Sequence, residues 1–164
     1  MDREIVIHQP PLYLIGMKIH CWKCQARMPA VALMFEYTAT DSDAVGEDEE
    51  NEEMSGHLTI LSDTTYLPTD ILEYVQGRVP TFEYRYSKTV RSKYYANTCP
   101  GCNMISGDFF LHSEPGAPFF STTEQEASEL YLTEVPFEYP ARVSSSLSFN
   151  TGYSLITDHA KRIT

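Results

Sequence analysis

The sequence predicts a β-rich α+β fold in a single domain, residues 1–164, with one or two short helices. Three observations indicate this fold. A chain of 164 residues with 42% hydrophobic and 21% charged side chains suits one globular domain with an ordinary core. Most apolar segments alternate with polar residues at a period of two, which is typical of strands. Two Cys-x-x-Cys pairs lie far apart in the chain and can tie two distant segments together.

The alternating segments predict where the strands lie. We expect strands at residues 4–9, 12–19, 30–37, 57–61 and 81–88. Nearer the C-terminus, residues 146–149 and 153–156 are short apolar segments. They flank the tripeptide Asn-Thr-Gly at 150–152, which predicts a hairpin with a three-residue turn.

Two further segments have helical signals. In residues 67–77, apolar side chains recur at helical spacing between a proline that suits a first turn and a glycine that favours an end. In residues 122–132, Thr123 and Glu126 have the spacing of a capping box. The hexapeptide GDFFLH is too short to assign to a helix or a strand. We expect its apolar residues to belong to the core: Phe109, Phe110 and Leu111.

All the cysteines of the chain fall in the two pairs: Cys21, Cys24, Cys99 and Cys102. Each two-residue turn aims two sulfurs inward, and two such turns make a tetrahedral set of four thiolates, which suits Zn²⁺. Such a set leaves no open position on the metal, so we expect a structural zinc of zinc-ribbon type. Because 74 residues separate Cys24 from Cys99, metal binding should be strongly coupled to folding.

Other uses of these cysteines agree less well with the sequence. Two disulfides require an oxidising compartment, and the N-terminus carries no export signal. A thioredoxin-like site uses one pair, and iron–sulfur clusters usually have closer spacings. Trp22, between the first two cysteines, could shield one side of the metal. His20 is expected to be a strand-end residue and not a ligand.

The net charge of −11 is unevenly spread along the chain. Residues 41–53 hold eight of the 23 acidic residues and no basic ones, so we expect residues 41–56 to form an acidic mobile loop. No apolar run reaches the roughly 18 residues of a membrane helix. With no secretory signal at the N-terminus, we expect a soluble, cytoplasmic protein.

The residues around the cysteines also resemble a group of poorly characterised bacterial proteins, some of them associated with phages or plasmids. The shared pattern is CWKC leading into an apolar strand, then AN-CP-C followed by GDFFLH, at residues 21–24, 96–102 and 107–112 here. The match covers about 45 residues in two blocks. It implies a zinc-ribbon module and a bacterial source, but no activity. Asn103 stands where the pattern has glycine, and asparagine tolerates a left-handed turn.

The sequence contains no recognisable catalytic set. Its histidines are scattered, and it has no glycine-rich phosphate loop, nucleophile elbow or metalloprotease helix, so we expect a non-catalytic protein. The leading hypothesis is a zinc-binding protein that binds a basic protein partner, as an immunity protein does when it occludes the active site of a bacterial toxin. The candidate contacts are acidic: Asp48, Glu49, Glu50, Glu124, Glu126 and Glu129.

The alternative hypothesis is a zinc-ribbon accessory protein of phage or plasmid origin that binds nucleic acid. Residues 78–95 carry five basic residues against one acidic residue, with five aromatic residues interleaved. Two arguments oppose it. First, an ordinary strand with its aromatic face packed on the core has the same residue pattern, and here that face would be Phe82, Tyr84 and Tyr86. A protein of pI about 4.8 is also repelled by phosphates as a whole.

Overall fold

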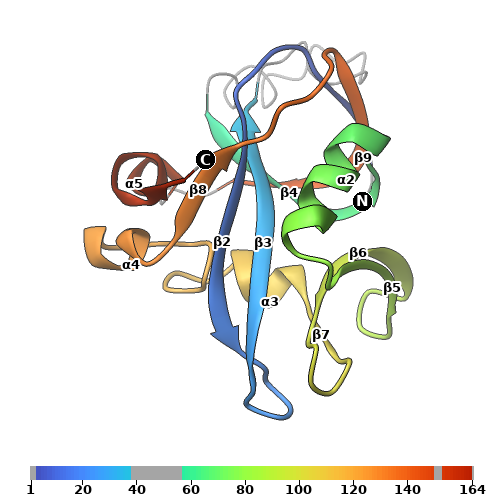
Figure 1. The fold of residues 1–164 in the computed structure, drawn as a ribbon, viewed down its shortest axis with the longest axis vertical. Helices are drawn as coiled ribbons and strands as arrows, with labels where there is room; N and C mark the ends of the chain where they lie inside the picture. Colours follow the sequence, from blue (N-terminus) through green and yellow to red (C-terminus); the bar gives the residue numbers. More distant parts are fainter. Residues whose placement is uncertain (1–2, 38–56, 150–152, 164) are drawn as a thin grey trace.

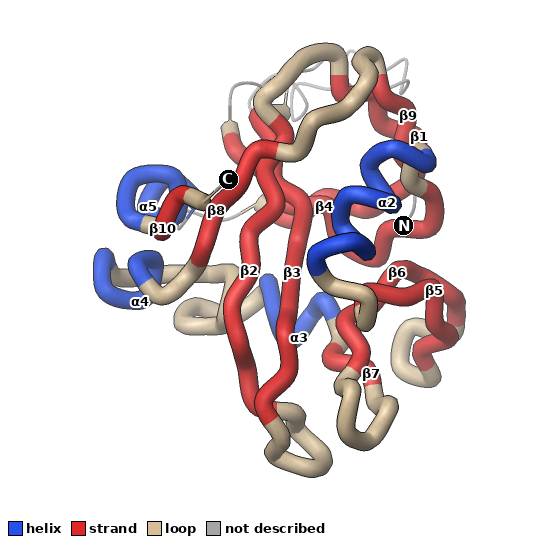
Figure 2. Tube along the Cα trace, viewed as in Figure 1, coloured by secondary structure: helices blue, strands red, loops and turns tan. Residues whose placement is uncertain are grey.

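Two sheets organise the residues that the computed structural model describes, which are 3–37, 57–149 and 153–163 (Figures 1 and 2). From edge to edge, the larger sheet contains β1 (Arg3–Ile7), β9 (Ala141–Ser148), β4 (Leu58–Tyr66), β3 (Arg27–Glu36), β2 (Leu12–His20), β8 (Tyr131–Glu134) and β10 (Lys161–Arg162). The smaller sheet contains β5 (Phe82–Ser87), β6 (Ser92–Thr98) and β7 (Ile105–Ser106). Neighbouring strands are antiparallel, except that β10 runs parallel to β8.

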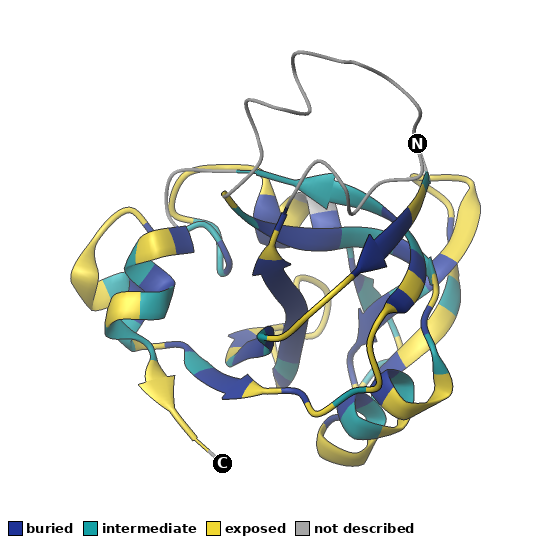
Figure 3. Ribbon diagram, turned by 90° about the horizontal axis from the view of Figure 1, so that it is seen from above, coloured by how far each residue is buried: buried dark blue, intermediate teal, exposed yellow. Residues whose placement is uncertain are grey.

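The helices are α2 (Thr69–Arg78), α3 (Asp108–His112), α4 (Glu124–Ser128) and α5 (Tyr153–His159). One core cluster joins the sheet to α2 through Leu67, Ile71 and Val75, which recur at helical spacing and are buried. A second cluster gathers around Ile15 and Phe119 and includes apolar residues of α3, α4 and α5. Alternate residues of β2 and β3 belong to one cluster or the other, so the centre of the larger sheet is buried on both faces. Figure 3 colours the buried residues dark blue, and they concentrate in the strands inside the molecule.

The long β2–β3 hairpin projects from the body of the fold, as Figure 1 shows at its lower end. Its register runs from Leu12 opposite Phe35 to His20 opposite Arg27, so the first cysteine pair lies at its tip. Gly16 lies opposite Tyr131 of β8, and a Cβ at this glycine would collide with the Tyr131 ring and hydroxyl. The glycine therefore provides the space that the tyrosine ring needs.

The strand-rich α+β class predicted from the sequence is confirmed, as are the strands predicted at 12–19, 30–37 and 81–88. The strand predicted at 57–61 continues to Tyr66. The helix predicted at 67–77 is α2, and it runs one residue past the glycine expected to end it. The described part of the chain has four helices, which is more than the predicted one or two.

Two elements near the C-terminus differ from the prediction. Residues 153–159 form the helix α5 and not the second strand of a hairpin, because Tyr153 and Ile156 are buried at helical spacing. The turn predicted at 150–152 lies outside the described residues. The helix predicted over 122–132 stops at Ser128, since the chain from Tyr131 joins the sheet as β8 beside β2. The capping box is present, with Thr123 Oγ1 accepting from the Glu126 N–H at 3.1 Å.

The hexapeptide GDFFLH forms the short helix α3. Leu111 is fully buried, as expected for a core residue. Phe110 is 54% exposed and is not part of the core, because a helix that lies against the body of the fold buries only one of its faces. The side chain of Phe109 lies outside the described part of the structure. The acidic loop predicted at 41–56 also lies outside the described residues.

Candidate metal centre

The first cysteine pair sits in a tight turn between β2 and β3. The Cys21 N–H donates to the Ala26 carbonyl at 2.8 Å, and the Gln25 N–H donates to the Cys21 carbonyl at 3.0 Å. Gln25 has a φ of 65°, in the left-handed region. The Lys23 N–H points at the Cys21 sulfur, 3.4 Å away. These hydrogen bonds hold both cysteine side chains on the inside of the turn.

The second pair repeats this geometry between β6 and β7. The Cys99 N–H donates to the Met104 carbonyl at 2.8 Å, and the Asn103 N–H donates to the Cys99 carbonyl at 2.9 Å. Asn103 has a φ of 67°, so asparagine accepts the left-handed turn as the sequence predicted. The Gly101 N–H lies 3.4 Å from the Cys99 sulfur. The two turns are therefore structural copies, with matching bonds at matching positions.

The two turns bring the four sulfurs together in one cluster. Cys21 Sγ lies 3.5 Å from Cys102 Sγ, Cys24 Sγ lies 3.6 Å from Cys99 Sγ, and all four atoms are within 4.8 Å of one another. Metal–sulfur bonds of about 2.3 Å in a tetrahedron require sulfur–sulfur distances of about 3.8 Å. Cys21 and Cys99 are buried, whereas Cys24 is exposed. The residues fit a tetrahedral ion, and the cluster could hold a metal.

The environment of the thiols favours deprotonation on one side of the cluster. Hydrogen bonds from the backbone N–H groups of Cys24 and Lys23 lower the pKa of the Cys21 thiol to about 6, against the opposing effect of burial. For Cys102, the Met104 N–H lowers the pKa, but burial and the neighbouring thiols raise it to about 11. Because metals bind thiolates, loading the cluster at neutral pH must release protons.

The residues next to the cysteines hold the two turns against each other. Trp22 is 55% exposed, and its indole N–H donates to the Ile105 carbonyl of β7 at 2.9 Å. It therefore links the first turn to β7, and the shielding of the metal stays a prediction. His20 ends β2, where its Nδ1 lies 3.2 Å from the Gln25 carbonyl, and it is not in the cluster.

A buried asparagine joins the smaller sheet to the larger one beside this cluster. Asn97 Oδ1 accepts from the Val31 N–H at 2.9 Å, and Asn97 Nδ2 donates to the Val31 carbonyl at 3.0 Å. Val31 lies on the part of β3 that β4 does not reach, so these two backbone groups would otherwise be unpaired. The sequence shows this asparagine only as part of the AN-CP-C pattern, with no signal for its role.

The acidic residues predicted to contact a partner are only partly described. Asp48, Glu49 and Glu50 lie outside the described residues. Glu124, Glu126 and Glu129 lie together on α4 and its C-terminal end. The Glu126 carboxylate accepts from Thr122 N–H and Oγ1, and the side-chain hydrogen bond lowers its pKa. Glu126 therefore has a capping role, and Glu124 and Glu129 are the more exposed pair.

The basic aromatic segment 78–95 is less buried than the sequence suggested. Phe82 is buried, but Tyr84 is 47% exposed and Tyr86 is 53% exposed. The predicted aromatic core face is therefore wrong beyond Phe82. The reason is that β5 is the edge strand of the small sheet, and only Phe82 at its start belongs to the core cluster that also contains Ile71 and Val75 of α2.

An open groove of about 750 Å³ lies on another side of the molecule. It is lined by residues of α2, β8, β10 and the adjoining loops, among them Tyr74, Phe137 and Tyr139. Its lining is largely apolar and contains no cysteine or histidine.

No family model, curated protein or solved structure matches this chain. No helix in the described part of the chain is long and apolar enough to span a membrane.

Proposed function

We propose that the four-cysteine cluster binds Zn²⁺ as a structural metal and that the protein is a non-catalytic nucleic-acid-binding module. Four thiolates at near-tetrahedral spacing support zinc, and such a closed set leaves no position for a substrate. The resemblance to phage- and plasmid-associated proteins with the same cysteine pattern implies the zinc-ribbon module only, and it implies no activity.

The observation that carries the nucleic-acid proposal is the separation of charge. Residues 17–28 and 81–106, which contain the two cysteine turns, hold seven of the 12 basic residues and only one of the 23 acidic residues, a net charge of +6. The rest of the chain has five basic and 22 acidic residues, a net charge of −17. The low overall pI therefore describes the rest of the chain and not the region around the metal centre, which we call the basic end.

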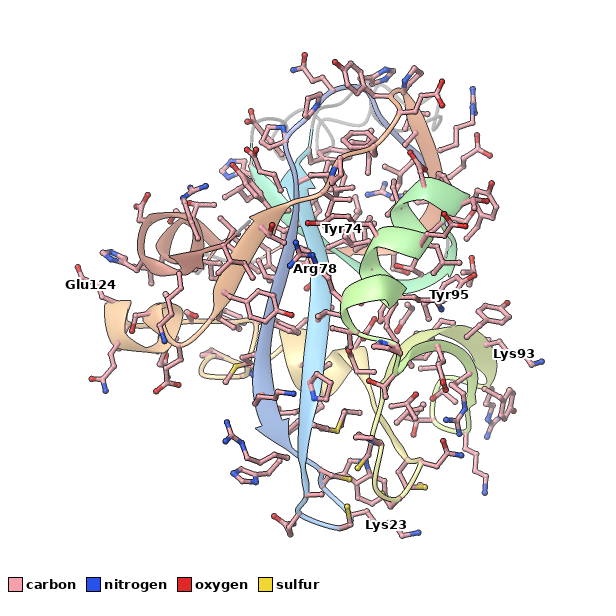
Figure 4. All side chains as sticks on the ribbon, in the orientation of Figure 1. Lys23, Tyr74, Arg78, Lys93, Tyr95 and Glu124 are labelled. Atoms are coloured by element: carbon pink, nitrogen blue, oxygen red, sulfur yellow. The ribbon has the colours of Figure 1, made fainter. Side chains whose placement is uncertain are left out.

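The basic end depends on the cluster because its two parts are remote in sequence. Figure 4 shows Lys23 on the β2–β3 tip and Lys93 on the small sheet, with Glu124 across the molecule on α4. The cysteine cluster and the Trp22–Ile105 bond connect these two parts. Phosphates are attracted to clustered Lys and Arg side chains, and this attraction supplies most non-specific nucleic-acid affinity.

Binding of a labelled oligonucleotide, followed by fluorescence anisotropy over a range of salt concentrations, tests this proposal. We expect Lys88→Glu to weaken binding. It should also flatten the plot of log K against log[salt], by about 0.7 for each phosphate of a single strand that the variant no longer neutralises. Lys161→Glu makes the same change of charge at an exposed lysine outside the basic end, and it should have a much smaller effect. Equal effects of the two variants, or no binding at micromolar protein in low salt, would refute the proposal.

A second candidate rests on the net charge of −17 outside the basic end. We propose, as the alternative, that this acidic part binds a basic protein, as an immunity protein binds a toxin. Co-purification from the native host at low salt should then recover one basic protein in stoichiometric amount. Glu124→Lys with Glu129→Lys should release it, whereas Glu114→Lys with Glu73→Lys, a matched change at exposed sites, should not. Recovery of nucleic acid alone would argue against it.

A further inference from the structure

A face of the small sheet presents tyrosine rings beside basic side chains. We define the tyrosine face by Tyr66 at the end of β4, Tyr84 and Tyr86 on β5, and Tyr95 and Lys93 on β6. Tyr66 is 54% exposed, close to the values for Tyr84 and Tyr86. Large aromatic side chains normally bury their surface, so three half-exposed rings in one neighbourhood require an explanation.

The register of β5 and β6 places these residues on one side of the small sheet. Tyr84 lies opposite Tyr95, and Tyr86 lies opposite Lys93. Residues that lie opposite each other in an antiparallel pair project to the same face. The rings of Tyr84 and Tyr95 have centroids 5.1 Å apart, so these side chains are in contact.

The inner end of the face is anchored in the core. Tyr95 stacks on the buried Phe82 with centroids 5.9 Å apart and an interplanar angle of 19°. Burial raises the pKa of the Tyr95 hydroxyl, and the nearby hydroxyls of Tyr84 and Tyr66 raise it further. Tyr66 ends β4, which packs against β6. The face is therefore supported from below while its outer rings remain accessible to solvent.

The charge of this face favours an anion. Lys93 projects from it, and Lys88 and Arg91 are exposed in the turn that joins β5 to β6. The only acidic residue of the β5–β6 hairpin, Glu83, lies on the opposite side of the sheet, 3.9 Å from Arg85. Arg85 is itself held by Asn103 of the second cysteine turn, through bonds of 3.2 and 3.1 Å.

We propose that the tyrosine face binds single-stranded nucleic acid, with bases stacked on Tyr84 and Tyr86 and phosphates held by Lys88, Arg91 and Lys93. This inference rests on the proposed nucleic-acid function and names the class of partner. Unpaired bases offer their flat faces to aromatic rings, whereas a duplex keeps those faces stacked inside. Alternate residues of a strand are about 7 Å apart, so Tyr84 and Tyr86 can receive successive bases. The recognition should tolerate any sequence, because every base has a face that can stack.

The test compares tyrosine variants on a labelled 16-nucleotide single strand and on the same sequence as a duplex. We expect the wild-type protein to prefer the single strand. Tyr86→Leu should weaken single-strand binding by about 5- to 150-fold, the usual effect of removing one aromatic stacking partner. Tyr86→Phe, which keeps the ring, should bind within about twofold of wild type. Phe110→Leu is the control, since Phe110 is 54% exposed on α3 and the pocket that it lines contains no residue of the tyrosine face.

The outcomes separate this inference from the proposed function. If Lys88→Glu weakens binding but Tyr86→Leu does not, or if duplex binds as tightly as single strand, the stacking inference fails and the electrostatic function stands. If neither variant changes affinity, or if only a protein partner is found on this face, both proposals fail. The salt dependence of Tyr86→Leu should match that of wild type, because the substitution removes no charge.

Discussion

Asn97 shows how a single side chain can join two sheets. Its amide forms two hydrogen bonds to the backbone of Val31, in the way that a neighbouring strand would. Both residues are buried, so water cannot replace either bond. Only an amide has the donor and the acceptor that this geometry requires, and a hydrophobic residue of the same size would leave both backbone groups unpaired.

We predict that Asn97→Ala destabilises the protein by about 2 to 4 kcal/mol, since two buried backbone groups would then have no partners. Urea unfolding with a constant m-value measures this change in the free energy of unfolding. Ser92→Ala, at an exposed position of the same strand, is the control and should change stability by less than about 0.5 kcal/mol. If Asn97→Ala lowers the free energy of unfolding no more than the control does, other contacts hold β6 to β3.

At the scale of elements, α3 fixes an irregularity in β4. The pairing of β4 with β9 shifts register between Ser62 and Tyr66, and Asp63 has a φ of 50°. Its N–H donates to Asp108 Oδ2, at the start of α3, at 2.7 Å.

Burial raises the pKa of Asp108 to about 8, partly offset by this hydrogen bond. On the same helix, burial lowers the pKa of His112 to about 3, and no described residue offers a partner to its ring nitrogens.

These two shifts predict how stability depends on pH. Asp108 keeps its proton in the folded protein up to about pH 8, whereas the unfolded chain releases it near pH 4, so its contribution is lost as the pH rises between these values. His112 acts in the opposite sense, with its contribution lost as the pH falls from about 6.5 to about 3. The two effects oppose each other between about pH 4 and 6.5. Of these two groups only Asp108 still acts from there to about pH 8, where the lowered pKa of the Cys21 thiol acts in the opposite sense.

We therefore predict that the free energy of unfolding of Asp108→Asn rises relative to that of wild type as the pH increases from about 6.5 to 8, because the variant lacks the Asp108 contribution. Asparagine keeps the acceptor for the Asp63 N–H but does not titrate. The measurement is the free energy of unfolding of both proteins across this range, with Asp158→Asn as a control at an exposed aspartate of α5. Parallel curves for wild type and Asp108→Asn would show that Asp108 is ionised in the folded protein.

At the scale of the molecule, the cysteine cluster joins the β2–β3 hairpin to the small sheet and so assembles the basic end. The two turns are separated by 74 residues of chain, and closing a loop of that length has an entropic cost. A bound metal offsets this cost only in the folded protein, since the unfolded chain has no preformed site. Stability, metal content and binding by the basic end should therefore change together.

Removal of the metal should lower the melting temperature by about 10 °C or more, because metal binding contributes directly to folding. Cys99→Ser should have the same effect and should abolish stoichiometric zinc, measured by elemental mass spectrometry on the same sample. His20→Ala is the control, since this residue adjoins Cys21 but lies outside the cluster, and it should retain its zinc. Unchanged melting of Cys99→Ser or of the chelated protein would contradict a metal at these four residues.

The local elements and the ligand set could be predicted from the amino-acid sequence alone. Alternation at a period of two predicted the strands at 12–19, 30–37 and 81–88, and the repeated spacing of the cysteines indicated one cluster before any fold was known. These inferences succeed because they depend on neighbours within a few residues. The same local view was wrong for α5, where a short apolar segment fits a helix and a strand equally well.

Which faces of these elements are covered was settled by the tertiary structure. A period of two shows that Phe82, Tyr84 and Tyr86 share a face, but burial depends on what lies across that face, and the body of the fold covers only the first of them. The partners of Asn97 and Asp108 are 66 and 45 residues away, beyond any local pattern. The basic end is likewise divided between two remote segments, so its charge can be recognised only once the cysteine cluster has brought them together.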